Sequence, residues 1–424
     1  MGAKAKMCPM YLAQGIGAGV RVRTGRGNPF DIQILECYGA WGIRHKTIEE
    51  VFIMAANVTP LAPNHKALGA RFTEFGGWEM PVQYTGVVDE HLAVRQTCGL
   101  FDLSHMGEVE VRGPMALDFV QSAMSNDVSK LKPGRVQYSL LCNEDGGIID
   151  DLLVYRHTDY VTLAVNASNT VKDLDWLESL AMQPPYRGEV DILNVGQERA
   201  ILAVQGPLAP KAMHAVGLDV LDLPYMSFKL IGQRGEMMVS RTGYTGEVGY
   251  ELYLPADDAV SWWDKLMALT DSIGIKPVGL GARDTLRLEM GYTLYGNDID
   301  ESTSPWEAGI GWAVKLDKEF IGREALARLK AVAPQRRLVG FKIEGRGIAR
   351  SGYQVMIEGA LRGEVTSGSI SPSLNIGIGL AYVDAASSGE GNPIDVIVRG
   401  KAVPARIASA PFVTSRVKDV VTAW

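Results

Sequence analysis

Two adjacent carboxylates in an apolar segment are the first candidates for chemistry. Asp150 and Asp151 follow two glycines and lie inside the expected strand Ile148–Arg156. Strand side chains alternate between two faces, so the two carboxylates point in opposite directions and we expect at least one to face the interior. A buried carboxylate costs several kcal/mol unless it is paired. The pair is therefore either a turn cap or an acid held to meet a cationic or N–H-bearing ligand, and both interpretations stay open.

A glycine-rich segment leads to a third carboxylate. Three glycines fall within seven residues from Gly243 to Gly249, which indicates a tight turn or a close approach of the backbone to another group. Glu251 follows in a strand-like run, where its carboxylate can accept two N–H donors from a planar heterocycle. The alternative is a hairpin whose glutamate faces solvent.

Two arginines offer a cationic counterpart. Arg283 and Arg287 fall on one face of an expected helix over 282–290, so together they could form a pocket for a carboxylate ligand. The alternative is a helix with surface charges that begins at a capping Asp284.

The histidines indicate no further catalytic centre. Asp102, Ser104 and His105 lie close in sequence, but residues so close rarely face one another and no nucleophile elbow is present. We therefore interpret His105 as structural. The six histidines form no metal-binding pattern, so no metal site is expected.

Alternating elements must position these residues. Strands are expected at 138–141, 148–156, 160–166, 199–205, 236–240 and 250–254, and helices at 114–124, 170–182, 207–216, 257–271, 282–290 and 322–331. After a linker at Pro334–Arg337, short apolar strands alternate with Gly, Ser and Pro turns, which is typical of a small antiparallel barrel or sandwich. The fold class is therefore α+β.

Composition excludes several classes. The chain has 424 residues and a net charge of −7, which does not favour non-specific nucleic-acid binding. No uncharged apolar run reaches the roughly 18 residues of a membrane span. Four cysteines without a CxxC pair indicate free thiols in a reducing compartment.

Residues 1–53 differ from the rest of the chain. They contain no serine, and the first 30 residues carry five basic residues and no acidic one. A transit peptide is normally Ser-rich, and a secretory signal needs a compact apolar stretch before a cleavage site. We favour a third interpretation, an over-long start with initiation at Met54, and expect residues 1–53 to be loosely ordered and dispensable.

The candidate segments, in order, resemble the glycine cleavage system T-protein family. The matching motifs, between about Leu61 and Thr414, are 75–84 (FGGWEMPVQY), 90–95 (EHLAVR), 101–106 (FDLSHM), 146–155 (GGIIDDLLVY), 205–207 (QGP), 243–247 (GYTGE), 282–284 (ARD), 295–300 (YGNDID) and 410–413 (APFV). The resemblance implies a three-domain cloverleaf around a central folate cavity. Residues 54–333 would form two intertwined folate-binding α+β domains, and residues 334–424 the small antiparallel β-barrel.

The resemblance also implies a reaction and its partners. An aminomethyltransferase of this family moves the one-carbon unit of an aminomethyl group on lipoylated H-protein to tetrahydrofolate, its co-substrate. The products are methylenetetrahydrofolate, ammonia and dihydrolipoyl H-protein, in glycine degradation. The lipoyl group comes from H-protein, and no nucleic acid or membrane is involved. The compartment would be the cytoplasm, or the mitochondrial matrix in a eukaryote.

The resemblance assigns roles to individual positions. The catalytic carboxylate falls on Asp151, with Asp150 as the alternative, because a carboxylate stabilises positive charge that develops on an electron-poor carbon. Ligand-binding positions fall on Met106, Asp150, Tyr155, Tyr244, Glu251, Arg283 and Arg416. Among these, Glu251 would accept the adjacent amino and ring N–H groups of the pterin.

Two other functions share this fold. One is a tetrahydrofolate-dependent demethylase, which would differ only at the donor entrance. The other is a non-enzymatic folate-binding factor for iron–sulfur protein assembly, which carries a Lys-Gly-Cys signature. That signature is absent here, and the intact pair of Asp150 and Asp151 favours the enzyme.

Truncation tests the interpretation of the N-terminal segment. A chain that begins at Met54 is expected to keep the activity of the full chain, because residues 1–53 carry no recognised chemistry. Activity of the two purified proteins and N-terminal sequencing of the native protein are the measurements. Loss of activity on trimming, together with a native start at Met1 or Gly2, would contradict the interpretation of residues 1–53 as dispensable.

Overall fold

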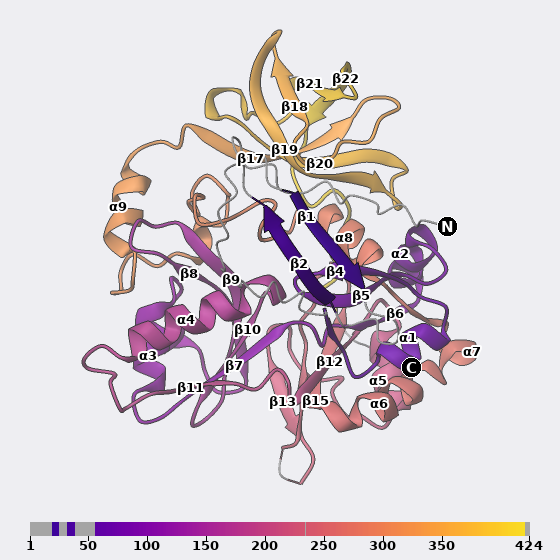
Figure 1. The fold of residues 1–424 in the computed structure, drawn as a ribbon, viewed down its shortest axis with the longest axis vertical. Helices are drawn as coiled ribbons and strands as arrows, with labels where there is room; N and C mark the ends of the chain where they lie inside the picture. The colour runs from indigo at the N-terminus through magenta and orange to yellow at the C-terminus, as the bar shows by residue number, and fades with distance from the viewer. Residues whose placement is uncertain (1–18, 25–31, 39–55, 234, 420–424) are drawn as a thin grey trace. The chain divides into compact units, whose positions relative to one another are not determined.

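The computed structural model describes residues 19–24, 32–38, 56–233 and 235–419, and the chain divides into two compact units. In the first unit, Met1–Ala55, strands β1 (Gly19–Thr24) and β2 (Ile32–Tyr38) pair antiparallel (Figure 1). The expectation that residues 1–53 are loosely ordered falls mostly outside the described residues and stays a prediction. The second unit, Ala56–Trp424, carries all the candidate site residues.

A five-stranded antiparallel sheet carries the aspartate pair. Its order is β11 (Asp191–Asn194), β7 (Gly107–Arg112), β10 (Val161–Val165), β9 (Ile148–Arg156) and β8 (Arg135–Cys142). Helices α3 (Ala116–Ala123) and α4 (Thr170–Ala181) bury the apolar side chains of one sheet face, among them Leu152 and Val154. Because strand side chains alternate, Asp151, Leu153 and Tyr155 of β9 lie on the other face.

A six-stranded sheet carries Glu251. Its order is β13 (Phe228–Ile231), β14 (Met237–Ser240), β15 (Gly249–Pro255), β12 (Arg199–Gln205), β6 (Cys98–Asp102) and β16 (Ile275–Pro277), and only β16 pairs parallel, with β6. Tyr250, Leu252 and Leu254 of β15 pack in one core with Trp263 of α6 (Ala259–Met267). The intervening Glu251 and Tyr253 therefore lie on the opposite face.

Smaller elements complete this part of the chain. Helices α5 (Ala209–Ala215) and α7 (Thr270–Ile273) accompany α6, so the expected helix over 257–271 is two helices. A three-stranded sheet follows the order β3 (Asn57–Val58), β5 (Trp78–Gln83) and β4 (Arg71–Phe75), beside α1 (Ala62–Ala67). Helix α2 (Val87–Gln96) packs against α8 (Leu280–Glu289), which also contacts β5 and the barrel strand β19.

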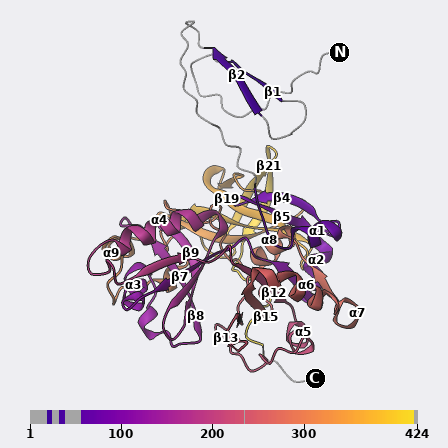
Figure 2. The same ribbon diagram turned by 60° about the horizontal axis from the view of Figure 1, so that its bottom comes forward.

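A closed six-stranded barrel follows helix α9 (Arg323–Ala331). Its order is β17 (Arg336–Ile343), β20 (Ile376–Asp384), β19 (Ala360–Ser371), β18 (Gln354–Ile357), β21 (Pro393–Val398) and β22 (Lys401–Ile407). Its apolar interior includes Phe341, Val365 and Val396. The α+β class and the C-terminal antiparallel barrel are confirmed, and Figure 2 shows the barrel strands β19 and β21 apart from the strands of the two sheets.

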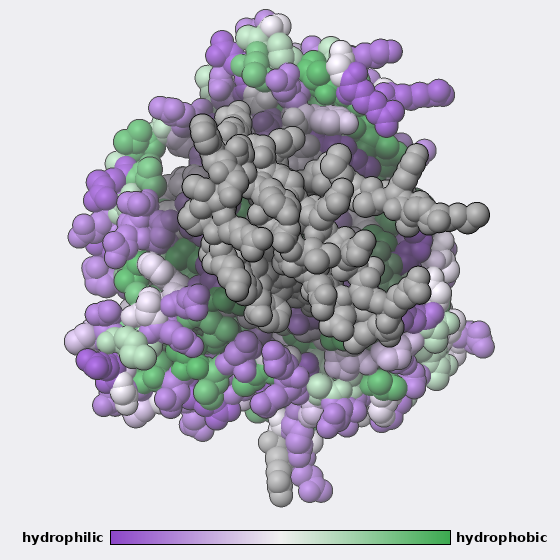
Figure 3. Space-filling view, in the orientation of Figure 1, coloured by the Kyte–Doolittle hydropathy of each residue, from purple (hydrophilic) through white to green (hydrophobic). Residues whose placement is uncertain are grey.

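The surface of the described residues is mixed. Among the coloured residues of Figure 3, polar ones predominate, with apolar residues in small groups between them. No helix in the described ranges is long and apolar enough to cross a membrane.

Buried ion pairs attach α8 to its surroundings. The guanidinium of Arg287 lies 2.7 Å from Asp298 Oδ2 and donates to Ser367 Oγ of β19 at 2.8 Å. Ser367 in turn donates to Asp298 Oδ1 at 2.7 Å. The hypothesis of a cationic pocket made by Arg283 and Arg287 together is therefore wrong, because Asp298 already neutralises Arg287.

Removing Arg287 tests this attachment. Arg287→Ala leaves the buried Asp298 carboxylate without its partner, so we expect a loss of about 3–5 kcal/mol in the free energy of unfolding. Arg362→Ala is the matched control, because Arg362 pairs with Asp384 at 3.1 Å while both side chains are about half exposed. That change is expected to cost about 1 kcal/mol or less. Denaturant unfolding measures both, and equal losses would contradict a structural role for the buried pair.

Candidate functional site

Asp150 is a fully buried carboxylate with donors from one neighbouring segment. Its oxygens accept from the backbone N–H of Asn166 at 3.0 Å, from Asn166 Nδ2 at 2.8 Å and from Asn169 Nδ2 at 2.5 Å. These donors follow β10 and precede α4. The interpretation of Asp150 as a turn cap is therefore wrong, because its three donors come from the segment between β10 and α4.

Asp151 lies on the opposite face of β9 and is partly exposed. Its Oδ2 accepts from the Tyr138 hydroxyl at 3.0 Å and its Oδ1 from Asn166 Nδ2 at 3.0 Å. Burial and then the charge of Asp150 raise the pKa of Asp151 to about 7, against the hydrogen bonds, which lower it. A carboxyl group that titrates near neutral pH can both accept and return a proton.

Glu251 is buried on the second sheet with one oxygen uncommitted. Its Oε2 accepts from Thr242 Oγ1 at 2.5 Å and from the Tyr253 hydroxyl at 3.4 Å. Within the described residues, Oε1 has no hydrogen-bond partner. Burial raises the pKa of Glu251, and the charge of Arg283 opposes that shift. The alternative of a solvent-facing hairpin glutamate is therefore wrong.

Arg283 is a cation without an anionic partner in the described part of the chain. Its guanidinium lies over the Tyr244 ring, 4.8 Å from the centroid, and makes no hydrogen bond or ion pair there. Burial lowers its pKa, while Tyr244 and Glu251 raise it. The Tyr244 hydroxyl donates to the Thr293 carbonyl, which fixes the ring. This arrangement leaves the guanidinium available for a carboxylate ligand.

The two sheets meet through tyrosines on their site faces. The hydroxyls of Tyr155 on β9 and Tyr253 on β15 lie 2.8 Å apart. Leu153 and Met106 pack in the same apolar cluster as both rings. The charges of Asp151 and Arg283 both act on Tyr244, and the charge of Arg283 also acts on Glu251. Five of the seven predicted ligand positions (Met106, Tyr155, Tyr244, Glu251 and Arg283) and Asp151 thus lie around one region, whereas Asp150 points to the opposite face of β9.

Arg416 is placed elsewhere. Its Nη1 lies 3.3 Å from Glu247 Oε2 and donates to the backbone carbonyl of Arg95 at 3.3 Å. Arg95 in turn pairs with Glu247 and Glu289. No contact of Arg416 reaches Asp151 or Glu251, so its role as a ligand contact stays a prediction.

The residues near His105 form no catalytic triad. Asp102 accepts from Thr59 Oγ1 at 2.6 Å and lies 2.9 Å from His65 Nε2, while Ser104 Oγ accepts from the Ile201 backbone N–H. His105 itself is buried, with its ring edge against Phe75.

Sequence reasoning missed the residues that hold the start of β9. Lys172 Nζ donates to the Ile149 carbonyl at 2.8 Å and to the Tyr295 hydroxyl at 2.7 Å, and that hydroxyl donates to the Ile148 carbonyl. Gly147 is required here, since a Cβ would lie 1.8 Å from the Glu301 carbonyl. The motif at 295–300 was the sequence pattern that could have indicated Tyr295. No pattern in the sequence indicated Lys172, Tyr138 or Asn166.

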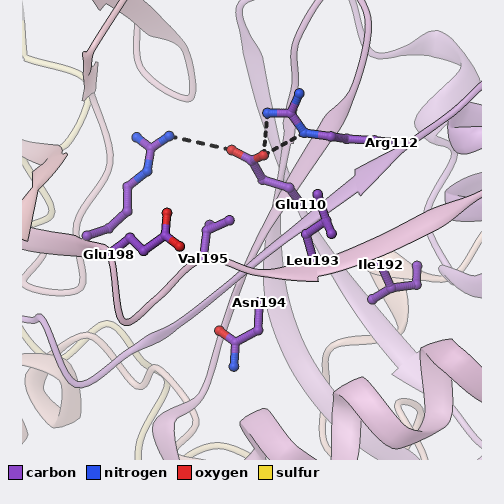
Figure 4. Close-up of a pocket in the computed structure, with 8 residues that line it drawn as sticks. Glu110, Arg112, Ile192, Leu193, Asn194, Val195 and Glu198 are labelled. Carbon is purple, nitrogen blue, oxygen red and sulfur yellow. Dashed lines mark hydrogen bonds and ion pairs between the residues drawn. The ribbon is translucent and has the colours of Figure 1, made fainter.

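Two surface hollows lie away from the predicted site residues. One, of about 510 Å³, is lined by residues such as Glu110, Arg112 and Asn194 (Figure 4). In it, Arg112 pairs with Glu110 at 2.5 Å. The other, of about 580 Å³, lies beside Lys172 and Trp176 of α4. Neither includes a predicted site residue, so the central folate cavity stays a prediction.

Two family models match this chain in the parts that the fold separates. The GCVT N-terminal domain matches residues 61–318, and the glycine cleavage T-protein C-terminal barrel domain matches residues 336–414. The chain belongs to the glycine cleavage T-protein family. The predictions of this family and of an enzyme are therefore confirmed.

Similar proteins agree with this assignment. An aminomethyltransferase of Halothermothrix orenii is 50% identical over 359 residues, which cover 84% of this chain and 99% of that protein. One of Symbiobacterium thermophilum is 48% identical over 365 residues, with 84% and 97% covered. The crystal structure of the glycine cleavage system aminomethyltransferase T from Bartonella henselae superposes with a TM-score of 0.80 at 38% identity, covering 85% of this chain and 99% of that one.

Opposite substitutions test the electrostatics of Asp151. Asp150→Asn removes a neighbouring negative charge, so the pKa of Asp151 is expected to fall. Tyr138→Phe removes a donor to the ionised form, so the pKa is expected to rise. Carboxyl-carbon NMR titration measures both, with circular dichroism as the control for folding. Shifts of the same sign in the two folded variants would refute the assigned causes.

Proposed function

We propose that this enzyme transfers the one-carbon unit of the aminomethyl group on lipoylated H-protein to tetrahydrofolate. The products would be methylenetetrahydrofolate, ammonia and dihydrolipoyl H-protein, in glycine degradation. The observation that carries the proposal is the juxtaposition of three groups: Asp151, which titrates near neutral pH, Glu251, with a free oxygen, and Arg283, without an anionic partner. The similar proteins from other organisms are named aminomethyltransferase, which supports the same reaction.

The residues present fit a folate. The free Oε1 of Glu251 and its partner oxygen can accept the adjacent amino and ring N–H donors of a pterin. Arg283 can bind a carboxylate of the glutamate tail, because its guanidinium makes no ion pair with a described residue. Met106 and Tyr155 supply apolar surface between these groups. Residues 54–333 would thus hold the folate, and residues 334–424 would form the barrel domain.

Asp151 has two roles in this proposal. In this reaction one carbon moves from H-protein to folate. Its bonds to sulfur and to the amino nitrogen break, and two bonds to folate nitrogens form. The two folate N–H protons end on the thiol and on ammonia. Asp151 can accept one of these protons and return it to a leaving group. Its negative charge also stabilises the positive charge that develops on the carbon. Tyr138 and Asn166 hold the carboxylate in place for both roles.

H-protein is the proposed partner, since it carries the lipoyl arm. We also propose a cytoplasmic location, or the mitochondrial matrix in a eukaryote. The buried thiols of Cys98 and Cys142 are free, which supports a reducing compartment.

Two substitutions separate chemistry from binding. Asp151→Asn removes the proton acceptor, so kcat is expected to fall by about 10²–10⁴-fold while folate affinity changes little. Glu251→Gln replaces a charged acceptor, so Kd for tetrahydrofolate is expected to rise about 10- to 100-fold, which corresponds to a charged hydrogen bond of about 1.5–3 kcal/mol. Turnover with aminomethylated H-protein and calorimetric folate titration are the measurements.

Glu198→Gln is the control, because Glu198 is exposed and lies in the hollow of Figure 4. It is expected to leave both kcat and Kd unchanged. Unchanged turnover in Asp151→Asn would overturn the catalytic role. Formation of methyltetrahydrofolate from a small methylated amine or sulfonium compound, with no methylenetetrahydrofolate from aminomethylated H-protein, would replace the proposal with the demethylase.

A further inference from the structure

A third carboxyl group lies behind the aspartate pair. Asp173 of α4 is fully buried, and neither of its oxygens accepts a hydrogen bond from a described residue. An ionised carboxylate in that position would lose its hydration with no such donor to replace it, which is unfavourable. The neutral acid avoids this cost and has a proton to donate.

The helix places this carboxyl beside Asp150. Asp173 follows Asn169 by one helical turn, so the two side chains share one face. Asn169 Nδ2 donates to Asp150 Oδ1 at 2.5 Å, so this face of the helix lies against Asp150, whose charge acts on Asp173. A hydrogen bond between two carboxyl groups requires a proton on one of them. Asp150 already accepts from three donors, whereas Asp173 accepts from no described residue, so Asp173 is the carboxyl that can carry the proton.

The surrounding charges agree with a neutral Asp173. Asp150 faces it from β9, the charge of Asp151 on the other face of that strand also acts on it, and Tyr295 approaches from the loop after α8. Its neighbour Lys172 is the nearby cation, but that ammonium group donates to Ile149 and Tyr295 and pairs with Glu301. Burial, and then the charge of Asp150, raise the pKa of Asp173 to about 10.

We propose that Asp173 is protonated at neutral pH and donates a hydrogen bond to Asp150, which makes it a positioning residue for the catalytic Asp151. Asp173 thereby adds a fourth donor to the three that hold the Asp150 carboxylate in place. The charge of Asp150 is in turn one cause of the near-neutral titration of Asp151. The role in turnover rests on the proposed function, whereas the protonation state does not.

Infrared spectroscopy tests the protonation state without any substrate. The difference spectrum between the full-length wild type and Asp173→Asn at neutral pH should show the loss of one protonated carboxylic acid C=O band. Asp175→Asn is the matched control, because Asp175 is exposed on the same helix. That control should lose an ionised carboxylate band instead. Loss of an ionised band in Asp173→Asn would overturn the proposal.

The pH dependence of stability gives a second readout. The pKa of Asp173 is raised from 3.8 in the unfolded reference to about 10 in the fold, so its contribution is complete at acidic pH and declines as pH rises between those values. Asp173→Asn cannot titrate. Its Tm relative to wild type should therefore increase from pH 5 to pH 9, whereas that of Asp175→Asn should not. A pH-independent difference for Asp173→Asn would overturn the proposal.

Turnover separates positioning from packing. Asp173→Asn keeps an N–H donor toward Asp150 and should stay within about threefold of wild type, while Asp173→Leu has similar volume but no donor and should lose about tenfold, as expected for a hydrogen bond to a charged group. Equal turnover of the two folded variants would refute positioning. If wild type lacks the proposed activity, the infrared and stability results still stand, so the two failures are distinguishable.

Discussion

The hydrogen bond between Tyr155 and Tyr253 joins the two sheets on which the site depends. Each hydroxyl is buried, so each needs a polar partner, and at 2.8 Å they satisfy one another. Tyr155 lies on the same face of β9 as Asp151, and Tyr253 on the same face of β15 as Glu251. Fixing the tyrosines therefore fixes where the two carboxylates lie relative to each other. Met106 and Leu153 fill the apolar space around the rings.

Environment, more than residue type, divides the charged groups into structural and available ones. Arg283 and Arg287 lie one turn apart on α8, yet Arg287 is neutralised by Asp298 and anchors the barrel, while Arg283 has only the face of Tyr244. Asp150 and Asp151 are adjacent, yet the three donors to Asp150 leave it fixed as a structural anion. Asp151 has two side-chain donors and partial exposure, so it is the member of the pair that a substrate can meet.

Helix α8 couples the site to the C-terminal barrel. Its Glu289 lies 3.1 Å from His91 of α2 and accepts from Ser371 of β19 at 2.5 Å. Together with the contact of Arg287 to Ser367, these bonds fix α8 between α2 and the barrel. Asp151, Glu251 and Arg283 lie outside the barrel strands, but the barrel holds the helix that presents Arg283. The barrel therefore supports the site by fixing the position of α8.

The sequence alone determined the local periods and therefore the faces. Alternation in the strand that holds Asp150 and Asp151 predicted that their side chains point in opposite directions, and the dense strands after Pro334 predicted a barrel or sandwich. The order of the motifs indicated the family. Only the tertiary structure decided which groups the charges contact. Asp150 accepts from Asn166 and Asn169, Arg287 pairs with Asp298, and Arg416 pairs with Glu247. Asp173 has no donor among the described residues. The period of a sequence pattern shows only which residues share a face of one element. Hydrogen bonds and ion pairs form between elements that the chain brings together from distant positions. A buried charge takes its pKa from those partners.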